Sequence, residues 1–440
     1  MKQKTVRRMK RILRGGMLGI MLLALGMGAP LPAAMASPSY RTVTEVFDWG
    51  PSVSKVIVDV EHDVRAEEVD ANRFRAHVKR TLAEGTKTMR SVMAGAPEEE
   101  GLEGDRAITA AYISDGEGNK AAHNHYVTLE LAVGPDDALG SAVNFDVRSF
   151  HNDWVKSDYT ITDTAAGTVI RACTGDVRPQ AAPFTYDIGN AEGSYLSFPY
   201  ASYEPRDGGT HPLIIWLHGM GEGGVTPSLT IMGNKAVQFA DESIQQYFGG
   251  AYVLAPQAAT YWMQGTSGFG DGTSVYENDL MAFLKRYVDA HPGIDKDRIY
   301  LGGDSNGGYM TMLLVRDNPG YFAAAFPTCE ALADRLITEK DLKQIAKTPL
   351  WFTAAQTDEV VPPKDYVVPT VERLKKCGAD VHFSFFDNVV DETGRYQKAD
   401  GTPYEYPGHW SWIYVYNDRC ETIIDGRSVK LFDWLSEQHR

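Results

Sequence analysis

The chain has 440 residues, which is more than one ordinary domain of about 100–200 residues uses, so we expect two domains. Hydrophobic residues make up 43% of it and aromatic residues 11%, which is enough for a large core and excludes a mostly disordered chain. The formal net charge of −15 disfavours a polyanionic partner, so nucleic-acid binding is not expected.

Residues 1–36 have the pattern of a secretory signal peptide. A strongly basic start precedes a short apolar run over residues 17–27, and Ala34-Met35-Ala36 has the form of a cleavage site. The run is shorter than the about 20 residues that a spanning helix needs, which favours cleavage over a membrane anchor. Arg7-Arg8 suggests a twin-arginine signal, but Lys10-Arg11 stand where that motif has apolar residues. We expect a secreted or cell-envelope protein.

Residues 37–183 predict a β-sandwich of the immunoglobulin-like type. Short β-branched or alternating runs are separated by turns, and Asp115 to Asn119 predicts a hairpin turn. The Cys…Trp…Cys signature of antibody domains is absent. The runs cover residues 56–60, 107–113, 125–133 and 168–173.

Two features of this region resemble metal sites. His123 and His125 lie on one side of a predicted strand, but no carboxylate or third ligand is evident nearby. The acidic turn at Asp115 lacks the downstream Glu of a calcium loop, so we interpret it as a solvated turn. No metal is assigned.

The four cysteines allow up to two disulfides in an oxidising compartment. Cys377 and Cys420 flank the last predicted strands, and we predict that they form a bridge. No CxxC pair or zinc-type Cys/His spacing is present. The other two are Cys173 and Cys329.

Residues 184–440 predict an α/β domain. Continuous apolar strands alternate with helical stretches, which is typical of a doubly wound, mainly parallel sheet covered on both faces. The predicted helices include residues 276–291 and 307–316. The predicted strands are residues 212–217, 251–255, 298–302, 321–326 and 350–353.

The strongest functional motif is Gly303-Asp304-Ser305-Asn306-Gly307, between a predicted strand and a predicted helix. This is the context of a nucleophile elbow, in which glycines permit a very tight turn that holds the serine out at the sheet edge. We therefore predict that Ser305 is a catalytic nucleophile.

A glycine-rich loop, residues 218–224, follows an earlier predicted strand. Acyl transfer needs donors for the oxyanion, and the backbone N–H groups of Met220 and Asn306 are the candidates. The alternatives are a plain glycine loop or a phosphate cradle, but the loop matches neither a Walker motif nor GxGxxG. We expect a structural role for His218.

In α/β domains that carry a nucleophile elbow, the catalytic acid and then the base follow the serine along the chain. Asp358 directly follows the strand at residues 350–353, with Glu359 and Asp387 as rivals. His409 follows a Pro-Gly turn, whereas His439 is the penultimate residue. We predict Asp358 as the catalytic acid and His409 as the base.

Residues 184–440 resemble the esterase and prolyl-oligopeptidase-like branch of the α/β-hydrolases, near the poly(3-hydroxybutyrate) depolymerase and feruloyl esterase type. The matching stretches are residues 217–222, 294–300, 303–309, 358–362 and 409–412. The whole chain also resembles exported esterases with an amino-terminal immunoglobulin-like domain. The resemblance implies a carboxylesterase, but fold alone does not fix the substrate.

The chain departs from that resemblance at Asp304, where many relatives carry a neutral residue, and in the long span of residues 388–408 before the predicted base. Trp262 and Trp410, with Trp412, are candidates to line the substrate site; the alternative is that they pack in the core or on the surface.

The sequence therefore predicts an exported, cofactor-free serine carboxylesterase that acts on a small-molecule or polymer ester. The alternatives are a serine peptidase of the prolyl-oligopeptidase-like type and a non-catalytic extracellular binding protein. The predicted parts are a signal peptide (1–36), an immunoglobulin-like β-sandwich (37–183) and an α/β-hydrolase domain (184–440), with the oligomeric state left open.

Overall fold

The computed structural model describes residues 37–440 apart from three short stretches, 89–99, 191–192 and 265–269. The predicted signal peptide, residues 1–36, lies outside the described residues. From Pro38 onward the chain packs as one compact unit. In the described part of the chain, no helix is both long and apolar enough to cross a lipid bilayer.

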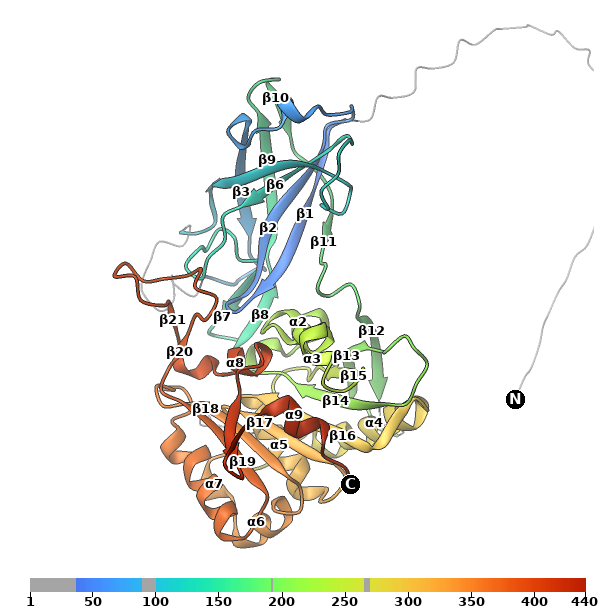
Figure 1. Ribbon diagram of the computed structural model, residues 1–440, viewed down its shortest axis with the longest axis vertical. Coiled ribbons are helices and arrows are strands. Elements are labelled where there is room, and N and C mark those ends of the chain that lie inside the picture. The colour runs from blue at the N-terminus through green and yellow to red at the C-terminus, as the bar shows by residue number, and fades with distance from the viewer. Residues whose placement is uncertain (1–36, 89–99, 191–192, 265–269) are drawn as a thin grey trace, which may run out of the picture. The chain divides into compact units, whose positions relative to one another are not determined.

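Residues 39–177 form two β-sheets that share one core (Figure 1). One sheet has the strand order β11-β1-β2-β6-β5 and the other has the order β10-β9-β3-β4. The strands are β1 Ser39–Phe47, β2 Gly50–Asp59, β3 Phe74–Thr81, β4 Glu103–Arg106, β5 Ile108–Ser114, β6 Tyr126–Leu131, β9 Lys156–Asp163, β10 Thr168–Ile170 and β11 Ala172–Val177.

Alternate residues of these strands face the shared core, as the period of a β-strand requires. Val56 and Val58 of β2 pack with Tyr159 and Ile161 of β9, and all four side chains are at most 1% exposed. The predicted immunoglobulin-like β-sandwich is thereby confirmed. A separate hairpin, β7 Val143–Asp146 and β8 His151–Trp154, extends from this domain.

The second domain is built on an eight-stranded sheet with the order β12-β13-β15-β14-β16-β17-β18-β19. β12 pairs antiparallel with β13, and β13 pairs antiparallel with β15. The remaining neighbours in this order, from β15 through β14 to β19, pair parallel. The strands are β12 Thr185–Asn190, β13 Ser197–Tyr203, β14 His211–Leu217, β15 Tyr252–Pro256, β16 Ile294–Asp304, β17 Ala324–Thr328, β18 Leu350–Ala355 and β19 Val381–Phe386.

Helices cover both faces of this sheet (Figure 1). In β14, Leu213 and Ile215 face the core shared with α4 to α7, whereas Ile214 and Trp216 face the core shared with α2, α3, α8 and α9. The helices are α2 Ser228–Met232, α3 Glu242–Gln245, α4 Glu277–Ala290, α5 Asn306–Asp317, α6 Glu339–Ile345, α7 Val367–Lys376, α8 Trp412–Tyr416 and α9 Leu431–Ser436. The predicted α/β-hydrolase fold is confirmed.

Two short hairpins complete the domain: β20 Val389–Val390 with β21 Glu405–Tyr406, and β22 Glu421–Ile424 with β23 Arg427–Lys430. The first lies within the long span that precedes the predicted base. That span also contacts the sandwich domain, since Tyr404 donates a hydrogen bond of 2.9 Å to Asp136.

The predicted disulfide between Cys377 and Cys420 is wrong, because both are free thiols. Cys377 is exposed at the end of α7, which packs on one face of the sheet through Leu374. Cys420 is buried on the opposite face, with its sulfur 3.4 Å from the hydroxyl of Thr353. The sheet separates the two sulfurs. The positions of the two cysteines in the sequence, near the last strands, do not indicate which face of the sheet each one occupies.

Candidate active site

The end of β14 and the turn after β16 meet at one edge of the sheet, because Leu217 pairs with Gly303. A Cβ atom added at Gly307 would lie 1.8 Å from the carbonyl oxygen of Leu217, and one added at Gly303 would lie 2.6 Å from the backbone of Gly307. No side chain fits at either position. The two glycines are therefore required by packing, as the motif predicts.

Ser305 lies in this turn with a strained backbone. Its φ of 53° and ψ of −110° are rare for a residue with a side chain, and such strain typically costs about 1–3 kcal/mol. Its N–H donates a hydrogen bond of 2.9 Å to the carbonyl of Thr328 on β17, which holds the turn in place. Ser305 also precedes the first residue of α5, where the positive end of the helix dipole favours developing negative charge.

The structure brings Ser305, His409 and Asp358 into one hydrogen-bonded chain. Nε2 of His409 lies 2.9 Å from the Ser305 hydroxyl, and Nδ1 lies 2.8 Å from Oδ2 of Asp358. Oδ1 of Asp358 accepts the backbone N–H groups of Val360 (2.9 Å) and Val361 (2.8 Å). Asp358 is 4% exposed and His409 is 9% exposed. The geometry suits a general base oriented by a buried carboxylate.

A close contact between two loops makes this chain possible. A Cβ atom at Gly408 would lie 2.3 Å from the backbone carbon of Thr357, so the loop with the histidine rests directly on the loop with the acid. The rivals lie elsewhere: Asp387 accepts a hydrogen bond from Gln356, and Glu359 is exposed. His439 is exposed near the carboxyl terminus.

The two predicted oxyanion donors each begin a helix that follows a strand at this edge of the sheet. Met220 begins the short helix η3 (Met220–Glu222) after β14, and Asn306 begins α5. Within the described residues, no hydrogen bond engages the N–H of either one, as is usual at a helix start. Both groups are therefore available to a ligand.

His218 holds the loop between β14 and η3. Its Nδ1 lies 2.6 Å from the carbonyl of Gly219, and its Nε2 accepts the N–H of Ala258 at 3.0 Å. Complete burial lowers the pKa of His218 to about 4, so the ring is neutral at physiological pH. The expected structural role of His218 is confirmed by these contacts.

The two predicted substrate-lining tryptophans lie in different surroundings. Trp262 is fully buried, packs against His218 and donates its indole N–H to that residue's carbonyl at 3.1 Å. Trp262 therefore supports the loop and has no surface open to a substrate. Trp410 is half-buried beside Trp412, whose ring meets that of His409 edge-on at 5.4 Å. Of the two tryptophans, only Trp410 has exposed surface that a ligand can contact.

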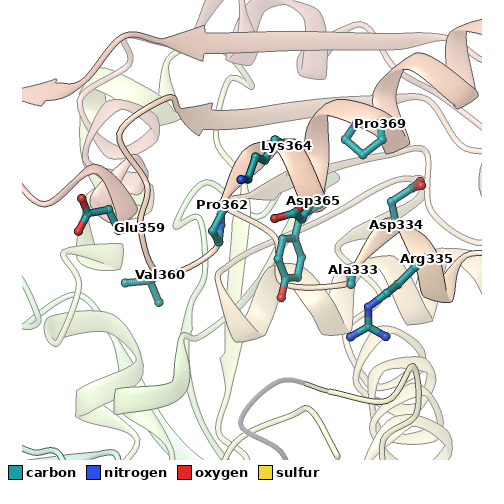
Figure 2. Close-up of a pocket in the computed structure, with 10 residues that line it drawn as sticks. Ala333, Asp334, Arg335, Glu359, Val360, Pro362, Lys364, Asp365 and Pro369 are labelled. Atoms are coloured by element: carbon teal, nitrogen blue, oxygen red, sulfur yellow. The ribbon is translucent and has the colours of Figure 1, made fainter.

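A hollow of about 770 Å³ opens beside the segment that follows Asp358. Figure 2 shows Glu359 and Val360 on one side of it and Ala333 and Arg335 on the other. Its lining mixes apolar side chains with charges of both signs. The remaining lining residues are Asp334, Pro362, Lys364, Asp365, Tyr366 and Pro369.

The sequence reasoning missed a pair of buried acids behind the serine. Glu222 in η3 and Asp304, directly before Ser305, are 3% and 0% exposed. Asn234 donates hydrogen bonds to both, at 3.2 and 3.1 Å, and Asn152 of β8 donates one of 2.8 Å to Glu222. A signal for Glu222 was available, because a glutamate between glycines in a close-packed loop has little access to water. Asn152 gave none, since its partner lies 70 positions away.

The two features that resembled metal sites are occupied by internal contacts. His125 lies 2.8 Å from a carboxylate oxygen of Asp59, and Asp115 accepts the N–H groups of Glu117 and Asn119. Across the described residues, no group of three or more His, Cys, Asp or Glu side chains has an arrangement that holds a metal ion.

Comparison with protein families gives two matches. Residues 39–171 match the esterase Ig-like N-terminal domain, and residues 272–366 match the prolyl oligopeptidase family. The second match contains the serine turn and the acid loop.

Among curated proteins, the chain is similar to the uncharacterized peptidase YtmA of Bacillus subtilis (strain 168), with 27% identity over 164 residues. This match covers 36% of the chain and 56% of the relative, so the chain spans little more than half of that protein's length.

Among solved structures, a thermostable esterase superposes with a TM-score of 0.69 at 24% identity, covering 91% of this chain and all of that one. This likeness shows a shared two-domain fold. An acylaminoacyl peptidase in complex with Z-Gly-Gly-Phe-chloromethyl ketone matches at 16% identity with a TM-score of 0.37, over 53% of this chain and 40% of that one. The chain has the fold and the family matches of a serine hydrolase.

Proposed function

We propose that the protein is an exported carboxylesterase in which Ser305 is the nucleophile, His409 the general base and Asp358 the residue that orients the imidazole. The observation that carries the proposal is the continuous hydrogen-bonded chain from the Ser305 hydroxyl to the Asp358 carboxylate. The likeness to a thermostable esterase and the esterase-type amino-terminal domain support ester substrates.

In the acylation step, Oγ of Ser305 forms a bond to the ester carbonyl carbon while its proton moves to Nε2 of His409. The carbonyl electron pair moves onto oxygen, and the N–H groups of Met220 and Asn306 donate to the resulting oxyanion. When this intermediate collapses, the bond to the alcohol oxygen breaks. His409 returns its proton to that oxygen, and the acyl group stays on Ser305.

Deacylation repeats these steps with water. His409 takes one water proton, the hydroxide adds to the acyl carbon, and Oγ of Ser305 leaves and recovers the proton. Asp358 orients the imidazole and stabilises the imidazolium without taking the proton, and it is itself held by Nδ1 of His409 and the N–H groups of Val360 and Val361. No cofactor takes part in these steps.

The substrate is a small or polymeric ester, and we place Trp410 at the edge of the site that receives its acyl or alcohol part. An ester suits this machinery better than a peptide, because an alkoxide or phenolate leaves with little help. An amine must be protonated by His409 as it departs, and its peptide must be held on both sides of the bond.

A serine peptidase is the second candidate, supported by the prolyl oligopeptidase family match. The test compares kcat/KM for p-nitrophenyl acetate and butyrate with that for proline- and alanine-containing peptide amides. We expect the esters to be cleaved much faster. Faster cleavage of the peptide amides would replace the esterase with the peptidase.

Residues 1–36 supply the export signal in this proposal. The test is to express the full chain in a bacterial host and to determine the mass of the protein found outside the cytoplasm. We expect a mature chain that begins at Ser37. Uncleaved protein retained in the cytoplasm would contradict export.

A further inference from the structure

Two carboxyl groups lie buried behind the candidate oxyanion site. Asp304 is fully buried directly before Ser305, and Glu222 is 3% exposed within the same short helix as Met220. A Cβ atom at Gly219 would lie 2.8 Å from Oδ2 of Asp304 and 3.0 Å from Oε2 of Glu222. The two carboxyls thus approach the same point from the two elements that carry the nucleophile and one oxyanion donor.

Amide groups hold the two carboxyls in place. Nδ2 of Asn234 donates to Oε2 of Glu222 at 3.2 Å and to Oδ2 of Asp304 at 3.1 Å. Nδ2 of Asn152 donates to Oε1 of Glu222 at 2.8 Å. Asn152 is on β8 of the amino-terminal domain, so one of the three hydrogen bonds joins that domain to the site.

No cation neutralises the pair: in the described part of the chain, neither carboxyl forms an ion pair with Lys, Arg or His. Lys235, next to Asn234, is engaged with Asp48 instead. Among the described residues, one oxygen of Asp304 has no hydrogen-bond partner. Burial raises the pKa of both acids, and repulsion from Asp304 raises that of Glu222 further. Both acids therefore bind a proton at a higher pH than an ordinary carboxyl does.

The β7–β8 hairpin also presses on the glycine loop around Glu222. A Cβ atom at Gly221 would lie 2.7 Å from Nδ2 of Asn152 and 3.3 Å from the ring of Phe145. One at Gly224 would lie 2.7 Å from a ring nitrogen of His151. The loop that carries Met220 is thus packed against the amino-terminal domain, not only against its own sheet.

We propose, on the basis of the esterase function above, that Asn152 of the amino-terminal domain is a positioning residue for the oxyanion site, acting through the Glu222–Asn234–Asp304 cluster. Asn152 fixes Glu222, and Glu222 fixes the helix that presents the Met220 N–H. Asn234 ties Glu222 to the residue before Ser305. The immunoglobulin-like domain is thereby a working part of the catalytic site.

The test compares Asn152→Ala with Trp154→Phe in the full chain. Trp154, on the same strand, donates its indole N–H to Ser228 at 3.1 Å. Each variant therefore removes one hydrogen bond between the domains. Of the two bonds, only that of Asn152 reaches the segment that carries Met220 and Glu222. The readouts are kcat and KM for p-nitrophenyl acetate, the rate of fluorophosphonate labelling of Ser305, and Tm.

We expect Asn152→Ala to lower kcat and the labelling rate about ten- to hundredfold, with KM nearly unchanged, because small misplacements of a transition-state donor are costly. Trp154→Phe should keep both rates within about twofold at a similar Tm. Equal rates for Asn152→Ala and the wild type, or equal losses in the two variants, overturn the proposal.

The variant Asn152→Asp adds a second measurement, the pH dependence of the labelling rate, which would not change if Asn152 served only in packing. The introduced carboxyl can donate to Glu222 only when protonated, and its carboxylate would repel the pair. The ratio of variant to wild-type labelling rate should therefore rise as pH falls, and a ratio independent of pH contradicts the proposal. Fluorophosphonate labelling of Ser305 does not depend on the identity of the substrate. A wild-type protein that is labelled but cleaves no ester would refute the esterase function alone. The labelling rates of the variants would still test the role of Asn152.

Discussion

Asp358 and Asp304 are two buried aspartates at the same edge of the same sheet, but their surroundings differ. Asp358 receives hydrogen bonds from Nδ1 of His409 and from two backbone N–H groups. Oδ2 of Asp304 accepts a hydrogen bond of 3.1 Å from Asn234, Oδ1 has no partner among the described residues, and a second carboxyl, Glu222, lies close by. Burial and a neighbouring carboxyl both disfavour the charged form of a carboxyl, whereas hydrogen-bond donors favour it. Asp358 is thus suited to orient and stabilise an imidazolium, whereas the Asp304–Glu222 pair is suited to hold a proton and to support neighbouring loops.

The largest expected effect tests whether Ser305 is the nucleophile that His409 and Asp358 activate. Ser305→Ala should lower kcat about 10⁵-fold, because it removes the nucleophile, and should leave Tm nearly unchanged, because a partly exposed hydroxyl adds little to packing. Ester kinetics and a thermal melt provide the measurement. Residual activity near that of the wild type would remove Ser305 from the mechanism.

A second substitution distinguishes Asp358 from its rival Asp387, which follows the next strand. Asp358→Asn should lower kcat about 10³- to 10⁴-fold, because the amide cannot stabilise the imidazolium and favours the wrong tautomer. Asp387→Asn is the matched control, since Asp387 accepts a hydrogen bond of 2.8 Å from the exposed Gln356 and none from His409. If Asp387→Asn were the crippled variant, the acid would lie one strand further along the chain.

A smaller effect tests the contact that brings His409 to Asp358. Gly408→Ala would place a Cβ atom 2.3 Å from the backbone of Thr357, so the two loops must separate. We expect kcat to fall about ten- to hundredfold. Gly134→Ala is the control, because the added Cβ would meet only a ring atom of Tyr396 at 4.0 Å. Similar kinetics for the two alanine variants would show that the contact does not position the base.

The smallest effect concerns stability and pH, and it sharpens the contrast between the two acids. Folding raises the pKa of Glu222 and Asp304, so the unfolded chain releases these protons at a lower pH than the folded protein does. Their contribution to stability is therefore complete below the ordinary carboxyl pKa of about 4 and is lost as pH rises through the raised values. Glu222→Gln should flatten this decline, so that the difference in Tm between variant and wild type shifts in favour of the variant from pH 5 to pH 9. A difference that does not change with pH would mean that the pair holds no proton.

Much of the catalytic domain was readable from local pattern. The strand at residues 298–302, the turn with Ser305 and the helix after it follow one another directly, so a short stretch of sequence contains the whole elbow. The acid and the base were predicted by their order and by the strand or turn that precedes each. The contact between Gly408 and Thr357 that unites them was not predictable, because it depends on how two loops pack.

The disulfide prediction failed for a related reason. Position along the chain showed that Cys377 and Cys420 lie near the last strands, but burial on opposite faces of the sheet is a property of packing. Trp262 illustrates the same limit: an aromatic residue in a loop is equally compatible with a substrate wall and with a core, and the structure places it in the core.

By itself the sequence determined the two fold types, the elbow and the identity of the residues that form the Ser305–His409–Asp358 chain, because strand period, glycine spacing and element order are local. Only the tertiary structure decided which buried carboxyls stand alone and which are paired. Asn152 and Glu222 are 70 positions apart and in different domains, and their hydrogen bond exists because a hairpin of the sandwich packs on a glycine loop of the hydrolase sheet. Burial, and the donors that accompany it, are set by the whole fold, and they determine the charge that each acid can carry.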